Sequence, residues 1–336
     1  MVYRPSWFRE GKVVVSSAPE CGINKDGLDR VIVDDEKHIG IDDELYADVL
    51  AIRNGKKTAT TGVVSLSQVL DPWRAVPTHF DTTSTDAFRA AMLAHWPDWS
   101  EVTIGELIDR GWVTRRDGHG SPSKDQRKGT VPYIKVSDLR AGLVNVNTTN
   151  MVPAEAALAL WNGPVSGLGA FDLLSPERAS SNIGEFCMLM PGQEQIVLTR
   201  EVIVLRVTKT APFDAFFLLW ALSLRVVRDQ WRRVIFMQTN RDDVGHRYQE
   251  ILLPIPPDEK EAQAASKEFR DYFKGLARLR SKFAEYPAVD NMHHFTLSGG
   301  GPTETDDELG RDDRVKLDMD PDEAMRKLLG AEPTEK

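Results

Sequence analysis

The feature that most constrains the fold lies near the C-terminus, where apolar and small residues recur with a heptad period. Asp258 and Glu261 are spaced as the two members of a helix capping box. Steps of three and four residues then separate Ala262, Ala265, Phe269, Tyr272, Leu276, Leu279, Phe283 and Tyr286. This period keeps one stripe of a helix facing a partner helix. The sequence therefore predicts one long helix over residues 258–286, about 42 Å in length.

Two uses of this stripe are open from the sequence alone. In the first, the helix pairs with another long helix, and the partner interface consists of Phe269, Tyr272, Leu276, Leu279 and Phe283. In the second, the same side chains pack on the helix's own domain. The heptad period favours the first use.

Residues 101–257 have the pattern of one compact domain that mixes strands with helices. Apolar runs between turn residues predict buried strands in FDLLSP, EFCMLMP, EVIVLRV and ILLPIPP. TVPYIKVSDLRAGLV predicts a strand, a turn and a second strand, and residues 213–233 predict a long helix with a basic end. The predicted fold class is therefore α+β, with a mixed sheet, flanking helices and the long helix after them.

The two ends of the chain have weaker patterns. Residues 1–62 predict short strands and loops with little core, residues 63–70 a strand that runs into a helical turn, and residues 84–97 a short helix. Residues 303–324 hold ten acidic and three basic residues, a composition that predicts a flexible tail. The predicted domains are 1–100 (an extended N-terminal region), 101–257, 258–286 and 287–336.

The charge is distributed unevenly along the chain. The net charge is −9, yet residues 110–140 hold eight basic and three acidic residues, and residues 225–247 hold six basic and three acidic residues. A nucleic-acid-binding face needs local positive charge and does not need a basic protein as a whole. The distribution is compatible with DNA binding, and a solvated charged surface is the alternative.

Several other classes of protein lack their sequence signatures here. The N-terminal residues have no apolar core of a signal peptide, and the apolar run AFFLLWALSL is too short to span a bilayer, so we expect a cytoplasmic protein with no membrane partner. Cys21 and Cys187 are far apart and predict two reduced thiols. The seven histidines have no metal-ligand spacing, and neither a phosphate loop nor a nucleophile elbow is present.

Residues 101–286 resemble the target-recognition domain and spacer helix of type I restriction–modification specificity subunits. The likeness is carried by TVPYIKVSDLRAGLV, FDLLSPERASSNIGEFCML, the stretch MQTNRDDVGHRYQEILLPIPPDEKEAQ and the position and period of the helix after it. It implies a target-recognition-domain-like fold and a subunit that reads double-stranded DNA for a separate DNA methyltransferase. Such subunits carry two recognition domains and two spacers, whereas this chain has one of each. The resemblance thus implies pairing with a second copy, or binding of one methyltransferase to an unsplit site.

Residues 10–57 have a second resemblance, to the C-terminal tail of type I adenine-specific DNA methyltransferases. GKVVVSSAPECGINKDG and DDELYADVLAIRNG carry this likeness. The methyltransferase's own motifs for the methyl donor and for a flipped adenine are absent from the sequence. The resemblance therefore implies no cofactor in this chain, and S-adenosylmethionine would bind the partner methyltransferase. A restriction subunit is a further implied partner.

If the first resemblance holds, three loops meet DNA. Arginine can form bidentate hydrogen bonds with guanine, and asparagine or glutamine can form them with adenine. Lysine and serine mostly contact phosphates. The loop over residues 114–129 supplies Arg115, Arg116, Lys124, Arg127 and Lys128. The loop over residues 175–184 supplies Arg178, Ser180, Ser181 and Asn182. The loop over residues 237–247 supplies Gln238, Asn240, Arg241, His246 and Arg247.

Three hypotheses follow. The first is a non-catalytic DNA-reading subunit of a type I-like restriction–modification or phage-defence methyltransferase complex. The second is an interaction scaffold in a defence complex that has lost DNA reading. The third is an enzyme of another type, for which Asp172, Glu185 and Lys209 are nuclease-like candidates at unusual spacing. Sequence-specific duplex binding by the purified chain separates the first hypothesis from the second, and cleavage or methyl transfer by the isolated chain would establish the third.

Overall fold

The structure is a computed structural model, and it describes residues 11–284 except 19, 25, 59, 71–75, 124, 126, 179 and 239–240. For residues 70, 237, 238, 241, 242, 283 and 284 it describes the backbone alone. The tail predicted for residues 287–336 lies outside the described residues. The predicted domain limits stay a prediction.

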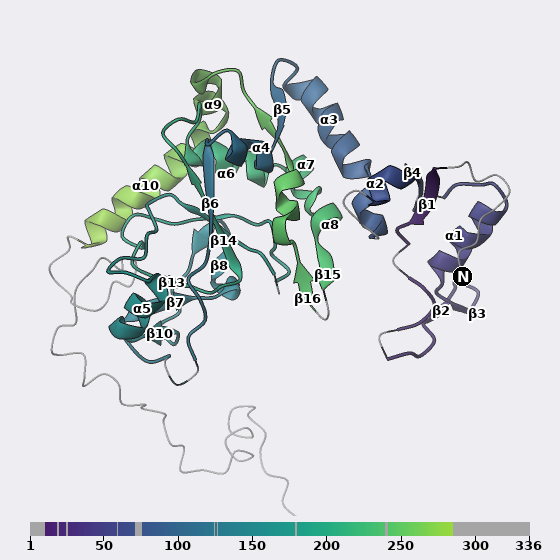
Figure 1. Cartoon of the computed structure of the whole chain (residues 1–336), viewed down its shortest axis with the longest axis horizontal. Helices are drawn as coiled ribbons and strands as arrows, with labels where there is room; N and C mark the ends of the chain where they lie inside the picture. The colour runs from purple at the N-terminus through teal and green to yellow at the C-terminus, as the bar shows by residue number, and fades with distance from the viewer. Residues whose placement is uncertain are drawn as a thin grey trace, which may run out of the picture. The chain divides into compact units, whose positions relative to one another are not determined.

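A six-stranded mixed sheet forms the centre of the main body, residues 77–284 (Figure 1). Its strands, in spatial order, are β6 (Val113–Asp117), β14 (Val202–Val207), β11 (Leu173–Pro176), β12 (Cys187–Met188), β9 (Leu143–Val144) and β8 (Leu139–Arg140). All neighbours are antiparallel except β12 and β9, which are parallel. The mixed sheet and its flanking helices confirm the predicted α+β class.

Both faces of the central strands β14, β11 and β12 are buried, which explains why these strands are largely apolar runs. Successive side chains of a strand point to opposite faces, so Leu173 packs in one hydrophobic cluster and its neighbour Leu174 in another. The larger cluster includes Phe217 and Tyr248 from the helical side. Each fully buried leucine stabilises the fold by roughly 1.5–3 kcal/mol.

Smaller sheets and helices complete the main body. The three-stranded sheet contains β10 (Met151–Val152), β7 (Val131–Ile134) and β13 (Val197–Leu198), with α5 (Ala154–Trp161) close to β13. β5 (Ser100–Thr103) pairs with β17 (Leu252–Ile255), and α4 (Ile104–Asp109) begins at a capping box between Thr103 and Glu106. α3 (Thr83–His95) contributes Phe88 and Met92 to the larger core cluster. The remaining short elements are the 3-10 helices η1 (Pro77–Phe80), η3 (Val136–Asp138) and η4 (Gly245–Glu250) and the hairpin of β15 (Phe236–Gln238) and β16 (Arg241–Asp243).

The single long helix predicted for residues 213–233 is wrong. The structure has three short helices there, α6 (Ala215–Ser223), α7 (Arg225–Arg228) and α8 (Trp231–Val234). Leu224 takes an extended conformation (ψ 134°), which ends α6. Gln230, fully buried, then exchanges two hydrogen bonds with the backbone of Leu252 in β17, of 2.9 and 3.0 Å. The break between the helices therefore places an amide side chain against the sheet edge.

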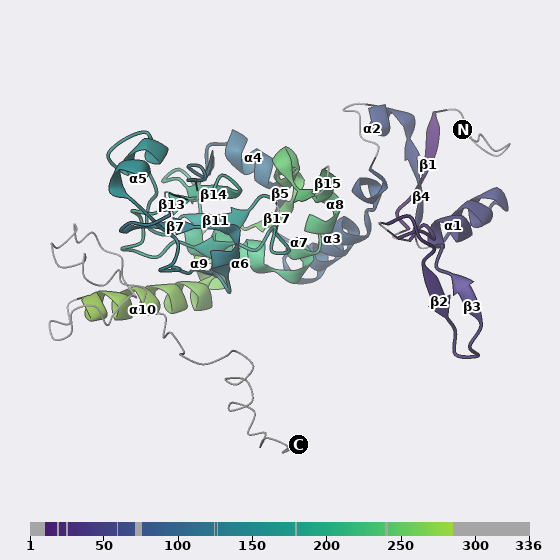
Figure 2. The same ribbon diagram turned by 90° about the horizontal axis from the view of Figure 1, so that it is seen from below.

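The C-terminal helix is confirmed, but it is not one uninterrupted rod. α9 (Glu259–Ala265) and α10 (Lys267–Ala284) meet at Ser266, whose buried hydroxyl donates to the carbonyl of Ala262 at 2.8 Å. A serine that bonds back to the preceding turn commonly bends a helix. α10 is about 27 Å long and packs along α6 (Figures 1 and 2).

The N-terminal region, residues 11–70, has its own elements. β1 (Lys12–Ser16) pairs with β4 (Thr61–Ser65), β2 (Val31–Val33) pairs with β3 (Ile39–Ile41), and α2 (Leu66–Leu70) follows β4. α1 (Glu44–Arg53) was not expected from the sequence. Asp48 of α1 accepts hydrogen bonds from the hydroxyls of Ser16, Thr58 and Thr60. These bonds hold α1 against the antiparallel pair of β1 and β4.

In the part of the chain that the structure describes, no helix is both long and apolar enough to cross a membrane.

Candidate nucleic-acid interface

Strands β6 and β11 finish, and strand β14 begins, at the same end of the central sheet. β14 runs antiparallel to both β6 and β11, so its first residues lie beside the last residues of the other two strands. Asp117 is opposite Ile203, and Pro176 is opposite Val202. The residues that flank these positions in the chain, Glu177 and Arg200, are therefore brought together although they are far apart in sequence.

These residues surround a polar cavity of about 410 Å³, called the charged cavity from here on. Its lining residues are Arg115, Asp117, Glu177, Arg178, Arg200 and His246. His246 reaches the cavity from η4, because the N–H of Val244 donates to the carbonyl of Glu177 at 3.1 Å. One side chain from each of the three predicted DNA-contacting segments, namely Arg115, Arg178 and His246, thus lies around one cavity.

Within the charged cavity, Arg115 contacts two carboxylates. The Arg115 Nη2 atom lies 2.5 Å from Asp117 Oδ1 and 3.5 Å from Glu177 Oε1. The Arg115 Nε atom is buried and has no hydrogen-bond partner among the described residues. Burial raises the pKa of Glu177 above its ordinary value, against the opposing effect of Arg115 and Arg178.

Basic side chains of the charged cavity are accessible, beside the exposed carboxylate of Asp117. The side chain of Arg178 is 44% exposed and lies 3.4 Å from Asp243. Arg200 is exposed and forms no ion pair within the described ranges, and His246 is exposed as well. Guanidinium groups in such positions can donate to phosphates or to the acceptor edges of bases.

The placement of Arg115 and Arg116 in one loop is wrong. Both belong to strand β6, and the alternation of a strand sends them to opposite faces of the sheet. Arg116 lies on the face of Arg206, which pairs with Asp172 at 2.6 Å. Burial lowers the pKa of Arg116, and the neighbouring Arg206 lowers it further. Arg116 is therefore separated from the charged cavity by the sheet.

Other predicted residues lie away from the cavity lining. Arg127 stacks over the ring of Tyr133 beside the three-stranded sheet, with 5.6 Å between the guanidinium carbon and the ring centre, and Lys128 is exposed. Ser180, Ser181 and Asn182 form a turn that is closed by local hydrogen bonds, including Asn182 N–H to Ser180 Oγ at 3.1 Å. The structure thus does not bring these five residues to the charged cavity.

Arg247 supports the β15–β16 hairpin. Its guanidinium donates to the carbonyls of Val234 at 2.9 Å and Asp243 at 2.6 Å, and it stacks over Phe236 at 4.1 Å. Lys124 and Asn240 lie outside the described residues, as do the side chains of Gln238 and Arg241. Their predicted contacts with DNA remain predictions.

Sequence reasoning missed Asp117, Glu177 and Arg200 as members of this site. Arg200 directly precedes the predicted strand EVIVLRV, so its position at a strand start was visible. The order of strands in the sheet decides which strand starts and ends meet, and that order was not readable from the sequence.

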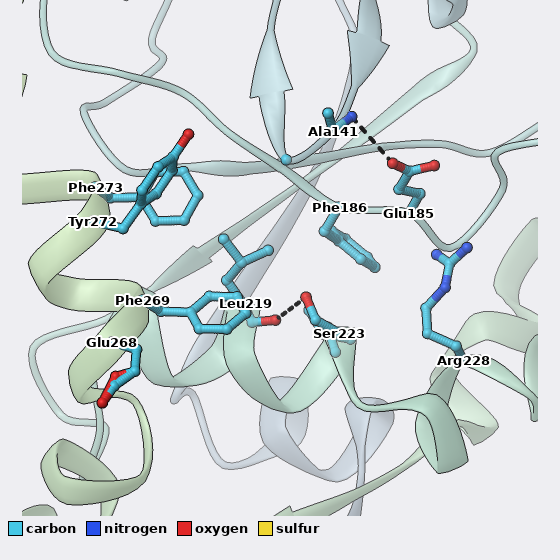
Figure 3. Close-up of a pocket in the computed structure, with 12 residues that line it drawn as sticks. Ala141, Glu185, Phe186, Leu219, Ser223, Arg228, Glu268, Phe269, Tyr272 and Phe273 are labelled. Carbon is cyan, nitrogen blue, oxygen red and sulfur yellow. Dashed lines mark hydrogen bonds between the residues drawn. The ribbon is translucent and has the colours of Figure 1, made fainter. Parts of the chain in front are cut away.

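A second cavity, of about 610 Å³, lies beside α10 (Figure 3). Phe186, Leu219, Phe269 and Phe273 line its apolar part, and Arg228 and Glu185 lie at one end. The predicted partner stripe is divided here. Phe269 and Leu276 pack against the chain's own core, whereas Tyr272 and Leu279 are 58% and 55% exposed. The side chain of Phe283 lies outside the described residues.

The described residues do not gather a metal-binding group of three or more His, Cys, Asp or Glu side chains. Burial raises the pKa of the Cys187 thiol to about 12, so this cysteine is not a nucleophile at neutral pH. The nuclease-like candidates do not meet, because Asp172 and Lys209 line one cavity and Glu185 lines another.

No protein-family model matches the chain, and no curated protein matches it. Among solved structures, the chain is similar to the type I restriction–modification S subunit from M. genitalium (14% identity, TM-score 0.36, 56% of this chain and 43% of that chain covered). It is also similar to the HsdS subunit from Thermoanaerobacter tengcongensis (14%, 0.34, 68% and 55%). A further similarity is to the type IIG restriction endonuclease BpuSI (10%, 0.40, 67% and 33%).

The chain thus spans about half the length of the two S subunits and a third of the endonuclease. With TM-scores of 0.40 or less, these likenesses assign no role to the chain.

Proposed function

We propose that the chain reads a sequence of double-stranded DNA at the charged cavity, as the non-catalytic specificity subunit of a type I-like restriction–modification or phage-defence methyltransferase complex. The observation that carries this proposal is the convergence of Arg115, Arg178, Arg200 and His246, from four separate segments, on one cavity. Methyl transfer and S-adenosylmethionine belong, in this proposal, to the partner methyltransferase.

The surroundings of the arginines in the cavity suit them to different contacts with DNA, some to base edges and one to a phosphate. Arg178 and Arg200 are exposed, but Arg178 lies 3.4 Å from Asp243, and Arg115 is held by Asp117 and Glu177. A guanidinium fixed by carboxylates keeps one orientation, which suits base-edge recognition better than a freely rotating side chain. Arg200 has no such support, which suits a phosphate contact.

The exposed residues of the heptad stripe support the proposal that a partner protein binds at α10. Tyr272 and Leu279 lie on the side of α10 that its own domain leaves exposed. We propose that this edge contacts the methyltransferase subunit or a second copy of the chain. Sedimentation of the full chain, alone and with the methyltransferase, distinguishes these partners, and Tyr272→Ala should weaken whichever complex forms.

Selection of tight-binding duplexes from a random pool, followed by titration of the full chain, tests the proposal. We expect one enriched sequence whose affinity falls steeply with salt. Arg178→Ala should cost roughly 1–3 kcal/mol and relax the preference at one position, as for a base contact. Arg200→Ala should weaken binding to all duplexes and lower the salt slope by about 1, as for a phosphate contact.

Arg278→Ala is the matched control, because Arg278 is also exposed but lies on α10, outside the lining of the charged cavity. Its affinity should equal that of the wild type. Failure to enrich any sequence would refute DNA reading and favour an interaction scaffold. Cleavage or methyl transfer by the isolated chain would refute the non-catalytic role.

A further inference from the structure

The exposed apolar residues of this protein are concentrated in its N-terminal region. Seventeen large hydrophobic residues are exposed in the described part of the chain, and twelve of them lie between residues 23 and 66. Soluble proteins rarely leave large apolar patches in water without a binding purpose. The concentration within one short region therefore points to an interaction surface.

The β2–β3 hairpin is the centre of this surface. Its register pairs Val31 with Ile41 and Val33 with Ile39, and paired or alternate residues of a hairpin share one face. These four side chains, called the aliphatic face from here on, are 54%, 56%, 64% and 77% exposed in the order Val31, Ile41, Val33, Ile39. The opposite face carries Ile32 and Gly40. The hairpin extends from the rest of the N-terminal region (Figure 2).

The hairpin has little support within the described structure. A two-stranded sheet is marginal in water by itself, and a third strand or a packed surface is needed for stability. Every residue of β2 and β3 is exposed, so this hairpin has no such cover among the described residues. A partner surface that buries the aliphatic face would supply this missing cover.

The charge around the aliphatic face selects the partner. Residues 29–44 hold seven acidic and two basic residues. Asp34, Asp35 and Glu36 form the turn at one end of the hairpin, and Asp42 and Asp43 follow its other end. Of the two basic residues, Arg30 is already paired with Glu20 at 2.5 Å and Asp42 at 3.1 Å. Both ends of the face are therefore anionic.

We infer that the aliphatic face of the β2–β3 hairpin docks a different protein, at an apolar surface rimmed by lysine or arginine. DNA is repelled by the acidic ends of the hairpin. A second copy would place the same acidic ends against each other, and the chain's own segment 303–324 is itself acidic. This inference does not rest on the DNA-reading function and concerns another surface of the protein.

Site-specific cross-linking in the full chain, expressed in its native host, tests the inference. A photoreactive benzophenone residue at position 33 lies on the aliphatic face, and the same residue at position 32 is the matched control on the opposite face. We expect position 33, and not position 32, to cross-link to one other protein. The linked peptide should contain aliphatic residues flanked by lysine or arginine.

The purified partner then gives a quantitative test with the full chain. Ile39→Asp should weaken the complex about 10-fold or more, and Ile32→Asp should change it less than twofold. The double variant Asp35→Lys, Glu36→Lys changes the turn and leaves both strands intact, and it should also weaken the complex. It therefore tests the inference even if the Ile39 variant misfolds. DNA affinity, measured on the same variants, should not fall.

Four outcomes would overturn the inference. They are a cross-link from position 33 to the same chain or to a second copy, equal cross-linking from positions 32 and 33, absence of any cross-link, and unchanged affinity in the Ile39 and charge-reversal variants. Loss of DNA binding in the Arg178 variant alone bears on the charged cavity and leaves this inference untouched.

Discussion

The main body and the N-terminal region use apolar and charged residues in opposite ways. The main body buries its aliphatic side chains on both faces of a six-stranded sheet and presents arginines at one edge of that sheet. The N-terminal region leaves an aliphatic hairpin exposed between acidic ends. The difference teaches that the two regions suit partners of opposite charge, because arginines surround the cavity of the main body and acidic residues flank the hairpin.

The largest expected effect is on the free energy of unfolding, when one aliphatic side chain of the same size is truncated to alanine in each region. Leu173 is fully buried in β11, and Ile39 is 77% exposed in β3. Leu173→Ala should lower the free energy of unfolding by about 2–5 kcal/mol, whereas Ile39→Ala should change it by less than about 0.5 kcal/mol. Urea unfolding of the isolated chain measures both. Equal losses would contradict the contrast between a packed and an unpacked region.

The hydroxyl cluster around Asp48 gives a second test, confined to the N-terminal region. Burial alone would raise the pKa of Asp48, but hydrogen bonds from Ser16, Thr58 and Thr60 outweigh it and hold the pKa below its ordinary value. A carboxyl whose pKa is lowered stabilises the fold above its unfolded value of about 3.9, and this stability is lost as the pH falls below it. Asp48→Asn should cost about 1.5–3 kcal/mol at pH 7.

Hydrogen exchange of residues 44–53 is the measurement for Asp48→Asn. Exchange there should accelerate, and exchange in β11 and β14 should stay as in the wild type. Acceleration in all of these segments together would show that the two regions unfold as one unit.

His119 gives the corresponding pH test for the main body. Its Nδ1 atom accepts the N–H of Leu198 at 2.9 Å and its Nε2 atom lies 2.9 Å from the carbonyl of Ser166, so the ring fits as the neutral form. Burial lowers the pKa of His119. The stability it contributes is therefore present above pH 6.5 or so and is lost as the pH falls below that value, by at most about 1.4 kcal/mol per pH unit.

Unfolding experiments between pH 7 and pH 5 measure this loss. His119→Gln should be less stable at pH 7 and should lose less stability on acidification than the wild type. An identical pH profile in the two proteins would show that His119 does not protonate in this range.

The smallest expected effect concerns Glu177 in the lining of the charged cavity. Its raised pKa means that the carboxylate takes up a proton earlier than usual as the pH falls, which leaves Arg115 with one fewer counter-charge. Glu177→Gln mimics the protonated form and should tighten DNA binding roughly fivefold, or about 1 kcal/mol. Affinity of the wild type should rise on acidification more than that of the variant. Unchanged binding by the variant would place Glu177 outside the interface, and weaker binding would show that its support of Arg115 outweighs its negative charge.

Periodicity and turn residues predicted much of the fold from the sequence. The apolar runs predicted β11, β14 and β17, and the spacing around Asp258 predicted the helical C-terminal segment. The break at Ser266 was missed because it depends on a hydroxyl that bonds to the backbone in the folded state, and the break at Leu224 because the residue pattern there continues that of a helix. α1 was missed because its hydrophobic pattern is weak and its position depends on the Asp48 cluster.

The candidate site was predicted in part. Arg115, Arg178 and His246 were expected to act together, and the structure places them around one cavity. Arg116 was assigned to the same group because residues 114–129 were predicted to be one loop, whereas adjacent residues of a strand point to opposite faces. Arg200 and Glu177 join the site only through the order of strands in the sheet, which local sequence does not specify.

Hydrogen exchange of the full chain, with and without its selected DNA duplex, tests the central claim most directly. The account predicts that the duplex slows exchange in the segments around residues 115–117, 177–178, 198–202 and 244–247, and leaves residues 31–41 unchanged. Protection of residues 31–41 by DNA, or no protection at the four cavity segments, would contradict it.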